Sequence, residues 1–269
     1  MLDSTAIGAV PDPPNLGAPR VAAARDSAPF NVRFGWGELG ARALVPGSDV
    51  VVVVDVITFT TAVAVAVERD CAIYPHPWDQ EAAAKLAGKV GAELAVGRSQ
   101  VGPETPYSLS PVTLSRAPHG TSIVLPSPNG SAVAAAAASE SGAQVVAGSL
   151  RNAFAVARFA RRHGGVISVI AAGERWPDRS LDPALEDLVG AGAIIDGLRR
   201  RRRSPEAQAA AAVYLQARRH GLRRTLQESV SGREQIERGY AGELDWAAAL
   251  NVSSAVPVLR AGAFRREPR

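Results

Sequence analysis

Five consecutive valines, Val50 to Val54, followed by one aspartate, Asp55, constrain the fold of this chain more than any other segment. An unbroken β-branched run predicts a strand buried on both faces, as in a parallel sheet covered by helices. A lone carboxylate at the end of such a strand costs free energy to bury without a partner. We therefore expect Asp55 either to cap the following turn and helix or to hold a cation, at the sheet edge where α/β proteins bind ligands.

Strand-like and helix-like segments alternate along most of the chain, which predicts βαβ units. The expected fold class is α/β, with a mainly parallel or mixed sheet layered between helices (α/β/α) and a helical C-terminal part. A first strand and a short helix or turn are expected within 31–47. The strands expected after it are 50–57, 72–75, 93–96, 122–126, 144–147, 166–171 and a terminal VPVL strand, and the expected helices are 60–68, 80–90, 131–139, 152–162, 183–202, 206–219, 221–229 and one that starts at Ser231 with the capping-box-like sequence SGRE.

The chain shows no internal repeat and no clean linker, so we expect a single domain over residues 30–262. Residues 1–29 are rich in proline, alanine and glycine without periodicity, and they are expected to form a disordered tail. Residues 263–269 are expected to form a second, short tail.

Composition and charge argue against several classes of protein. No uninterrupted apolar stretch of about 18 residues exists, so we expect no transmembrane helix and no membrane partner. The N-terminus lacks the pattern of a signal peptide, and the single cysteine, Cys71, is typical of a reducing cytoplasm. The formal net charge is +4, and the one dense basic run, Arg199 to Arg203, has no aromatic residues interleaved with it. We interpret this run as a solvated helix end and expect no nucleic-acid partner.

Four expected strand-to-helix loops share small or hydroxyl residues just before a helix start. Free backbone N–H groups and the positive end of the helix dipole favour anions such as phosphate at these places. The same residue types also cap helices for purely structural reasons, so each loop has both interpretations. The four loops are 58–61, 127–131 (SPNGS), 148–152 (GSLRN) and 173–187.

Two further acids, Glu186 and Asp187, fall in the first turns of the long helix expected after the last of these loops. Carboxylates at this position favour the helix dipole without any function. Together with Asp55 they would also suit Mg²⁺, which binds one or two carboxylates, waters and a substrate phosphate. Both interpretations stay open from the residues alone.

The order of the motifs along the chain resembles the 2-phosphosulfolactate phosphatase (ComB) family. The motifs are DVxxxTT, SP, PNGS, AGSLRNAFAVA, AAGE…ALEDLVGAGAI, SxSGREQIERGY and a terminal VPVL, over roughly residues 31 to 260. The resemblance implies an α/β fold and a Mg²⁺-dependent phosphatase that releases phosphate from 2-phosphosulfolactate to give sulfolactate.

The resemblance and the loop pattern together single out the expected site residues. The expected catalytic residues are Asp55, Asn129 and Asn152, and the expected metal ligands are Asp55, Glu186 and Asp187. The residues expected to bind substrate or phosphate are Thr58, Thr60, Thr61, Arg98, Ser127, Gly130, Ser131, Gly148 and Ser149.

The chain departs from the family pattern at three positions. Thr58 stands where the family motif DVLRA has its arginine, Gly97 where GER has its glutamate, and Leu109 where NSP has its asparagine. Arginine is the best bidentate partner for phosphate or sulfonate, so losing one predicts altered substrate recognition. Three arginines elsewhere in the chain could substitute, namely Arg98, Arg151 and Arg175.

The expected function is therefore a cytoplasmic Mg²⁺-dependent phosphatase for a small phosphorylated acid, in the first instance 2-phosphosulfolactate. The alternatives are a phosphatase for another small phosphomonoester and a non-catalytic protein that binds a phosphorylated metabolite. Homo-oligomerisation is left open.

Overall fold

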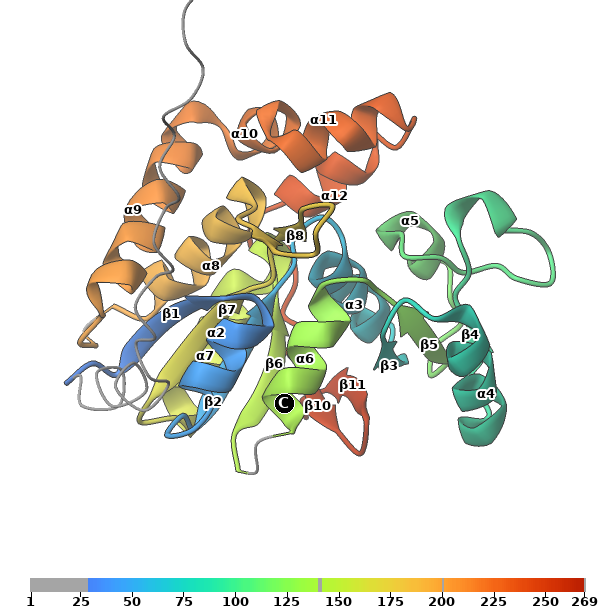
Figure 1. Cartoon of the computed structure of the whole chain (residues 1–269), viewed down its shortest axis with the longest axis horizontal. Helices are drawn as coiled ribbons and strands as arrows, with labels where there is room; N and C mark the ends of the chain where they lie inside the picture. The colour runs from blue at the N-terminus through green and yellow to red at the C-terminus, as the bar shows by residue number, and fades with distance from the viewer. Residues whose placement is uncertain (1–28, 140–141, 200, 269) are drawn as a thin grey trace, which may run out of the picture.

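The computed structural model describes residues 29–139, 142–199 and 201–268, so nearly all of the expected N-terminal tail lies outside the described residues. A single nine-stranded mixed sheet runs through the molecule with helices around it (Figure 1). The sheet has the order β1-β7-β2-β6-β10-β11-β3-β5-β4. The α/β fold class expected from the alternating pattern is confirmed.

The secondary structure follows the expected alternation with shifts of a few residues. The strands of the sheet are β1 Val32–Trp36, β2 Val50–Val54, β3 Ala72–His76, β4 Glu93–Leu94, β5 Ser122–Pro126, β6 Gln144–Gly148, β7 Ile167–Ala171, β10 Pro257–Arg260 and β11 Ala263–Arg266, and a separate hairpin holds β8 Glu174–Arg175 and β9 Leu181–Asp182. The helices are α2 Gly37–Leu44, α3 Phe59–Glu68, α4 Gln80–Val90, α5 Pro111–Leu114, α6 Gly130–Ala138, α7 Ala153–His163, α8 Leu185–Gly197, α9 Pro205–His220, α10 Leu222–Glu228, α11 Val230–Glu237 and α12 Glu243–Ala248, with short 3₁₀ turns at Arg98–Gln100 and Leu150–Asn152.

The valine run forms the central strand β2, and all five of its side chains are fully buried. Alternate valines face opposite sides of the sheet. Val50, Val52 and Val54 pack with α7, α8 and α9, whereas Val51 and Val53 pack with α2, α3 and α6. Burial on both faces explains why the run is continuous rather than alternating.

Parallel pairing brings the carboxyl ends of the central strands to one level. Val54 at the end of β2 is paired with Gly148 of β6 and with Ala171 of β7. The residues that follow each strand therefore meet at one edge of the sheet. Figure 1 shows α10, α11 and α12 lying across this edge.

The C-terminal hairpin joins two parallel groups of strands. β10 pairs antiparallel with β6, β11 pairs antiparallel with β3, and the two pair with each other. The expected tail over 263–269 is wrong for residues 263–266, because these form β11. Phe264 of this strand is fully buried and meets the ring of Phe59 edge-on at 6.2 Å between centroids.

Three expected boundaries are corrected by hydrogen bonds. The strand expected to reach residue 57 ends at Val54, because Asp55 N and Val56 N donate to the side chains of Thr60 and Asp187 instead of to a neighbouring strand. The helix expected to reach residue 202 ends at Gly197, so the arginine run lies in the connection to α9, where Arg201 donates to two backbone carbonyls. The cap of α11 is Ser229 rather than Ser231, since Ser229 Oγ accepts from Gly232 N at 3.1 Å.

Within the described ranges, no helix has the length and apolar character needed to cross a bilayer.

Candidate active site

A cavity of about 360 Å³ opens at the carboxyl edge of the sheet. Its walls come from the turns that follow β2, β5 and β7 and from helix α11, which covers them. Asp55, Asn129 and Glu174 follow the three strands, and α11 contributes Gln235 and other side chains. The cavity therefore depends on both the sheet edge and the C-terminal helical part.

Asp55 is buried in this cavity and joins two of the turns. Its Oδ1 accepts from Phe59 N at 3.0 Å, and its Oδ2 accepts from Gly130 N at 2.8 Å. Each carboxylate oxygen has a second lone pair, so both can still accept from or coordinate a ligand. Burial raises the pKa of Asp55 to about 6, although the backbone hydrogen bonds from Phe59 and Gly130 pull in the opposite direction.

Position 130 needs a glycine because the turn after β5 approaches Asp55 and Phe59 closely. A Cβ at this position would lie 2.6 Å from Asp55 Oδ2 and 2.3 Å from the ring of Phe59. The N–H of Gly130 donates to Asp55 in this structure, and the expected role of Gly130 in binding phosphate stays a prediction.

Asp187 ties the turn after β2 to the turn after β7. Its Oδ1 accepts from Val56 N at 2.7 Å, and its Oδ2 accepts from Gly173 N at 2.9 Å. Burial, and then the nearby charges of Asp55 and Glu186, hold the pKa of Asp187 well above its usual range. Neither Asp187 nor Glu186 lines the cavity. The two hydrogen bonds of Asp187 fix the two turns, and its role as a metal ligand stays a prediction.

Glu186 is buried beside these acids, and its Oε2 has no hydrogen-bond partner among the described residues. Its charge raises the pKa of Asp55, of Asp187 and of Glu174, which places it in the same electrostatic cluster. A buried carboxylate oxygen without a partner costs free energy unless a cation or donor meets it.

Mg²⁺ fits part of the expected ligand set. Over the described part of the chain, no three acidic, histidine or cysteine side chains converge as a metal-binding cluster. Mg²⁺ usually keeps several waters and takes only one or two carboxylates together with substrate phosphate. The unpartnered oxygen of Glu186 and the free lone pairs of Asp55 are oxygen ligands of the kind that Mg²⁺ takes, and a magnesium site formed by them stays a prediction.

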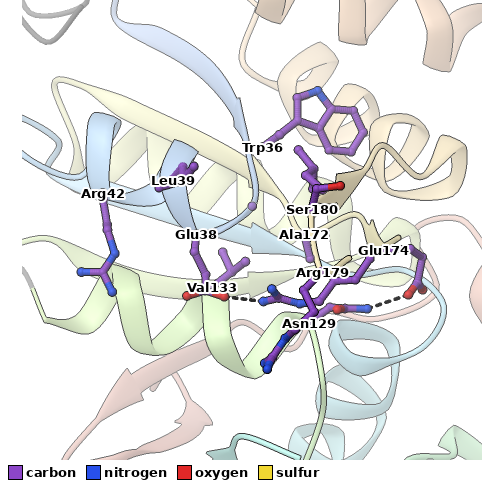
Figure 2. A pocket seen from close by; sticks show the side chains of 13 residues that line it. Trp36, Glu38, Leu39, Arg42, Asn129, Val133, Ala172, Glu174, Arg179 and Ser180 are labelled. Carbon is purple, nitrogen blue, oxygen red and sulfur yellow. Dashed lines mark hydrogen bonds and ion pairs between the residues drawn. The ribbon is translucent and has the colours of Figure 1, made fainter. Parts of the chain in front are cut away.

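Glu174 and Asn129 form a pair at the cavity wall. Asn129 Nδ2 donates to Glu174 Oε2 at 2.7 Å, as the dashed line in Figure 2 shows. Removal from water, and then the charge of Asp55, raises the pKa of Glu174 to about 8. Glu174 was not among the expected site residues, although it lies three residues after the end of β7, in the AAGE segment, and thus at the same edge as Asp55.

Arg98 lies beside Thr58, where the family motif would place its own arginine. The Arg98 guanidinium donates to Thr58 Oγ1 at 3.2 Å and to Glu243 Oε2 at 2.7 Å, and it covers the ring of Tyr240 at 4.8 Å. Both Thr58 and Arg98 line the cavity. Of the three arginines considered as substitutes, Arg98 is thus the one in the right place.

The other two arginines lie elsewhere. Arg151 pairs with Glu68 at 3.4 Å and covers the ring of Trp246, away from the cavity. Arg175 pairs with Glu38 at a neighbouring cavity.

Several expected phosphate-binding residues are structural. Thr60 Oγ1 donates to Asp55 O at 2.7 Å, Thr61 Oγ1 to Val56 O at 2.8 Å, and Ser131 Oγ to Ser127 O, so these hydroxyls cap backbone turns. None of the three lines the cavity.

The GSLRN turn is also structural, against expectation. Asn152 Oδ1 accepts from Ser149 N at 2.9 Å, and Asn152 Nδ2 donates to Ala147 O and Ala255 O. Both side chains are fully buried, and a Cβ on Gly148 would meet Ile194 and Val52 below 3 Å. In this structure Asn152, Gly148 and Ser149 hold the turn and do not line the cavity, and their predicted catalytic and phosphate-binding roles stay predictions.

Two buried polar atoms on the cavity wall are free to bind a ligand. Ser127 Oγ and Gln235 Oε1 have no hydrogen-bond partner among the described residues, and both side chains line the cavity. Leaving such an atom unsatisfied costs about 1–3 kcal/mol. Gln235 comes from α11, which also contributes Ser231 and Glu234 to the wall, and Arg238 follows directly after the helix. None of these four residues was expected at the site from the sequence.

Fold and cavity together define an α/β enzyme whose polar groups gather at the carboxyl edge of the sheet. A model of the 2-phosphosulpholactate phosphatase family matches residues 42–262. The chain therefore belongs to this family, which makes it a phosphoric monoester hydrolase. No curated protein gives a significant match.

Proposed function

We propose that this protein is a Mg²⁺-dependent phosphatase for a small phosphorylated acid, in the first instance 2-phosphosulfolactate, which it hydrolyses to sulfolactate and phosphate. The observation that carries the proposal is the buried carboxylate of Asp55 on the wall of a cavity with unsatisfied polar atoms, together with the buried carboxylate of Glu186, which is close enough to raise the pKa of Asp55. The family match supports the substrate.

Asp55 and Glu186 are the residues that would hold Mg²⁺. When bound there, the ion would offset the negative charge of these acids and of the phosphoryl oxygens. Asp187 would keep the turns on both sides in place through its two backbone hydrogen bonds.

The phosphoryl oxygens would meet donors that line the cavity. Arg98 presents its guanidinium, while Thr58 and Ser127 present hydroxyl groups. Phosphoryl transfer needs mainly positioning and charge stabilisation, which fixed donors of this kind supply. Arg98 is itself held by Glu243, so it needs little reorganisation when a phosphate arrives.

Glu174 is suited to protonate the leaving oxygen of the substrate. With a pKa of about 8, it keeps a proton at neutral pH, and its bond to Asn129 orients the carboxyl group. As a water oxygen bonds to phosphorus, the bond from phosphorus to the ester oxygen breaks and that oxygen takes the proton of Glu174. The proton lost by the attacking water returns Glu174 to its acid form.

The experiment is phosphate release from 2-phosphosulfolactate and from a panel of small phosphomonoesters, with Mg²⁺ or with EDTA. We expect release by the wild type only with Mg²⁺, and a loss of roughly a hundredfold or more in Glu186→Gln, since a metal-binding oxygen is replaced. The exposed Glu81 on α4 provides the matched control Glu81→Gln, which should behave as wild type.

Folding of each variant is checked by circular dichroism. Glu186→Gln is preferred to Asp55→Asn, because both oxygens of Asp55 accept from backbone N–H groups and an asparagine would turn its amide N–H against one of these donors. Binding of a phosphorylated acid without release from any ester would instead support the non-catalytic alternative. Mg²⁺-independent release that Glu186→Gln leaves intact would remove the proposed metal site.

A further inference from the structure

A second cavity of about 380 Å³ adjoins the candidate active site. It lies between α2 and the β8–β9 hairpin, and it shares Asn129 and Glu174 with the first cavity. Figure 2 shows Arg42 at one end of this second cavity and Glu174 at the other, with Arg179 between them in that view. Because Asn129 and Glu174 line both cavities, a molecule that contacts these two residues can extend into either cavity.

The two cavities differ in charge. The first has three acidic side chains, Asp55, Glu174 and Glu234, and two arginines on its wall. The second has three arginines, Arg42, Arg175 and Arg179, against Glu38 and Glu174. Because Glu174 lines both cavities, the second is the more positive by two charges whether or not Glu174 carries a proton.

Two of these arginines are available to a ligand. Arg175 is held by its ion pair with Glu38, which joins the hairpin to α2. Among the described residues, neither Arg42 nor Arg179 forms an ion pair, and both are exposed. An arginine guanidinium is the preferred partner for carboxylate and sulfonate groups because it can donate two parallel hydrogen bonds.

The hairpin fixes the position of Arg179 relative to Glu174. Arg179 N donates to Trp176 O at 2.8 Å, and Trp176 N donates to Ser180 O at 3.0 Å, so the loop is a closed turn. Gly173, at φ +69°, lets the chain fold back at this point, where a Cβ would lie 2.8 Å from Asp182 O. The arginine and the proposed proton donor are thus carried on one small unit.

We propose that this second cavity binds the acid groups of the substrate other than its phosphoryl group, through Arg42 and Arg179. The proposal rests on the proposed function, and it makes the substrate a phosphate ester with at least one further anionic group within a few bonds of the ester oxygen. The first cavity takes the phosphoryl group with its cation, and the more positive second cavity takes the carboxylate or sulfonate. Asn129 and Glu174, which line both, lie at the ester oxygen between them.

Three phosphate esters test this assignment, because each adds one acid group to the previous one: isopropyl phosphate, 2-phospholactate and 2-phosphosulfolactate. The variants are Arg42→Gln and Arg179→Asn, since asparagine tolerates the left-handed conformation that Arg179 adopts at φ +69°. The control is Arg158→Gln, which removes an exposed arginine on α7 that lines neither cavity.

We expect each variant to raise KM for the two acid-bearing esters by roughly tenfold, the effect of losing one charge-assisted contact. Their kcat, and both constants for isopropyl phosphate, should stay near wild type. Equal KM values for wild type and variants on all three esters would overturn the proposal, as would an equal rise in KM for isopropyl phosphate.

Calorimetric binding of sulfolactate separates this proposal from the proposed function, because that molecule has no phosphoryl group. The wild type and Arg158→Gln should bind it, whereas Arg179→Asn should bind it roughly tenfold more weakly. If no ester releases phosphate but sulfolactate binding still depends on Arg179, the phosphatase assignment fails and the second cavity stands. If phosphate is released but sulfolactate binds all variants equally or none, the second-cavity proposal fails alone.

Discussion

Replacing Gly130 by alanine tests how closely the turn after β5 must approach Asp55. The added Cβ would lie 2.3 Å from the Phe59 ring and 2.6 Å from Asp55 Oδ2. Both neighbours are buried, and the Phe59 ring is fully enclosed, so neither can move aside easily. Overpacking of this kind costs about 1–3 kcal/mol, and here it also displaces the hydrogen bond from Gly130 N to Asp55.

The better helix propensity of alanine offsets at most about 1 kcal/mol of this cost. With about 1 kcal/mol added for the lost hydrogen bond, we therefore expect Gly130→Ala to lower the free energy of unfolding by about 1–3 kcal/mol. We also expect it to reduce phosphate release at temperatures where the variant is still folded, because Asp55 is shifted. Urea denaturation and the Mg²⁺-dependent phosphatase assay measure the two effects.

The matched control is Gly88→Ala on α4, where a Cβ would meet no heavy atom within 4 Å. This change should leave activity unchanged and stabilise the protein by up to about 1 kcal/mol. If Gly130→Ala kept the stability and the activity of the wild type, the close contact between position 130 and Asp55 would not be needed, and this prediction would be refuted.

Three further predictions concern pH, the metal and a helix cap. Burial raises the pKa of Glu174 from 4.5 to about 8 in the folded protein. Its contribution to the free energy of unfolding is therefore fully present below about pH 4.5 and is lost as the pH rises through 8. In urea titrations the free energy of unfolding of the metal-free wild type should therefore fall between pH 5 and 9, and that of Glu174→Gln should fall less. An equal fall in both proteins would contradict a raised pKa for Glu174. Mg²⁺ at 100 times its Kd should stabilise the wild type by about 2.7 kcal/mol in thermal unfolding, and this gain should be absent in Glu186→Gln. Ser229→Ala should cost about 1 kcal/mol by removing the cap of α11, whereas Ser231→Ala should not remove a cap.

The strand at Val50–Val54 and the position of Asp55 were predictable from sequence because both depend on local pattern. A continuous apolar run can be covered on both faces in few ways, and the residue after it must lie at the sheet edge. The register that brings Glu186 near Asp55 comes from parallel pairing of β2 with β7, and the alternation of elements indicates such pairing.

Which hydroxyl groups face the cavity was not predictable. Thr58, Thr60 and Thr61 are near neighbours in sequence, yet only Thr58 lines the cavity, because the other two hydroxyls turn to backbone carbonyls. The GSLRN turn shows the same ambiguity, since a capping turn and a phosphate-binding turn use the same residue types. Only the three-dimensional path of the backbone separates the two.

The contribution of α11 could not be predicted for a different reason. Gln235 reaches the cavity because the C-terminal helices pack across the carboxyl edge, and this packing joins segments more than a hundred residues apart in the chain. Glu174 had a local signal, since it follows a strand at the same edge as Asp55. Its pairing with Asn129, 45 residues earlier, is again long-range.

Anomalous diffraction from crystals grown with Mn²⁺ in place of Mg²⁺, together with sulfolactate and phosphate, would locate the metal ion and both anions. We expect one anomalous peak with Asp55 and Glu186 oxygens at about 2.0–2.2 Å, and phosphate against Arg98 in the first cavity. A peak coordinated by other residues, or an active Mn²⁺ enzyme without a peak near Asp55, would rule out the proposed metal site.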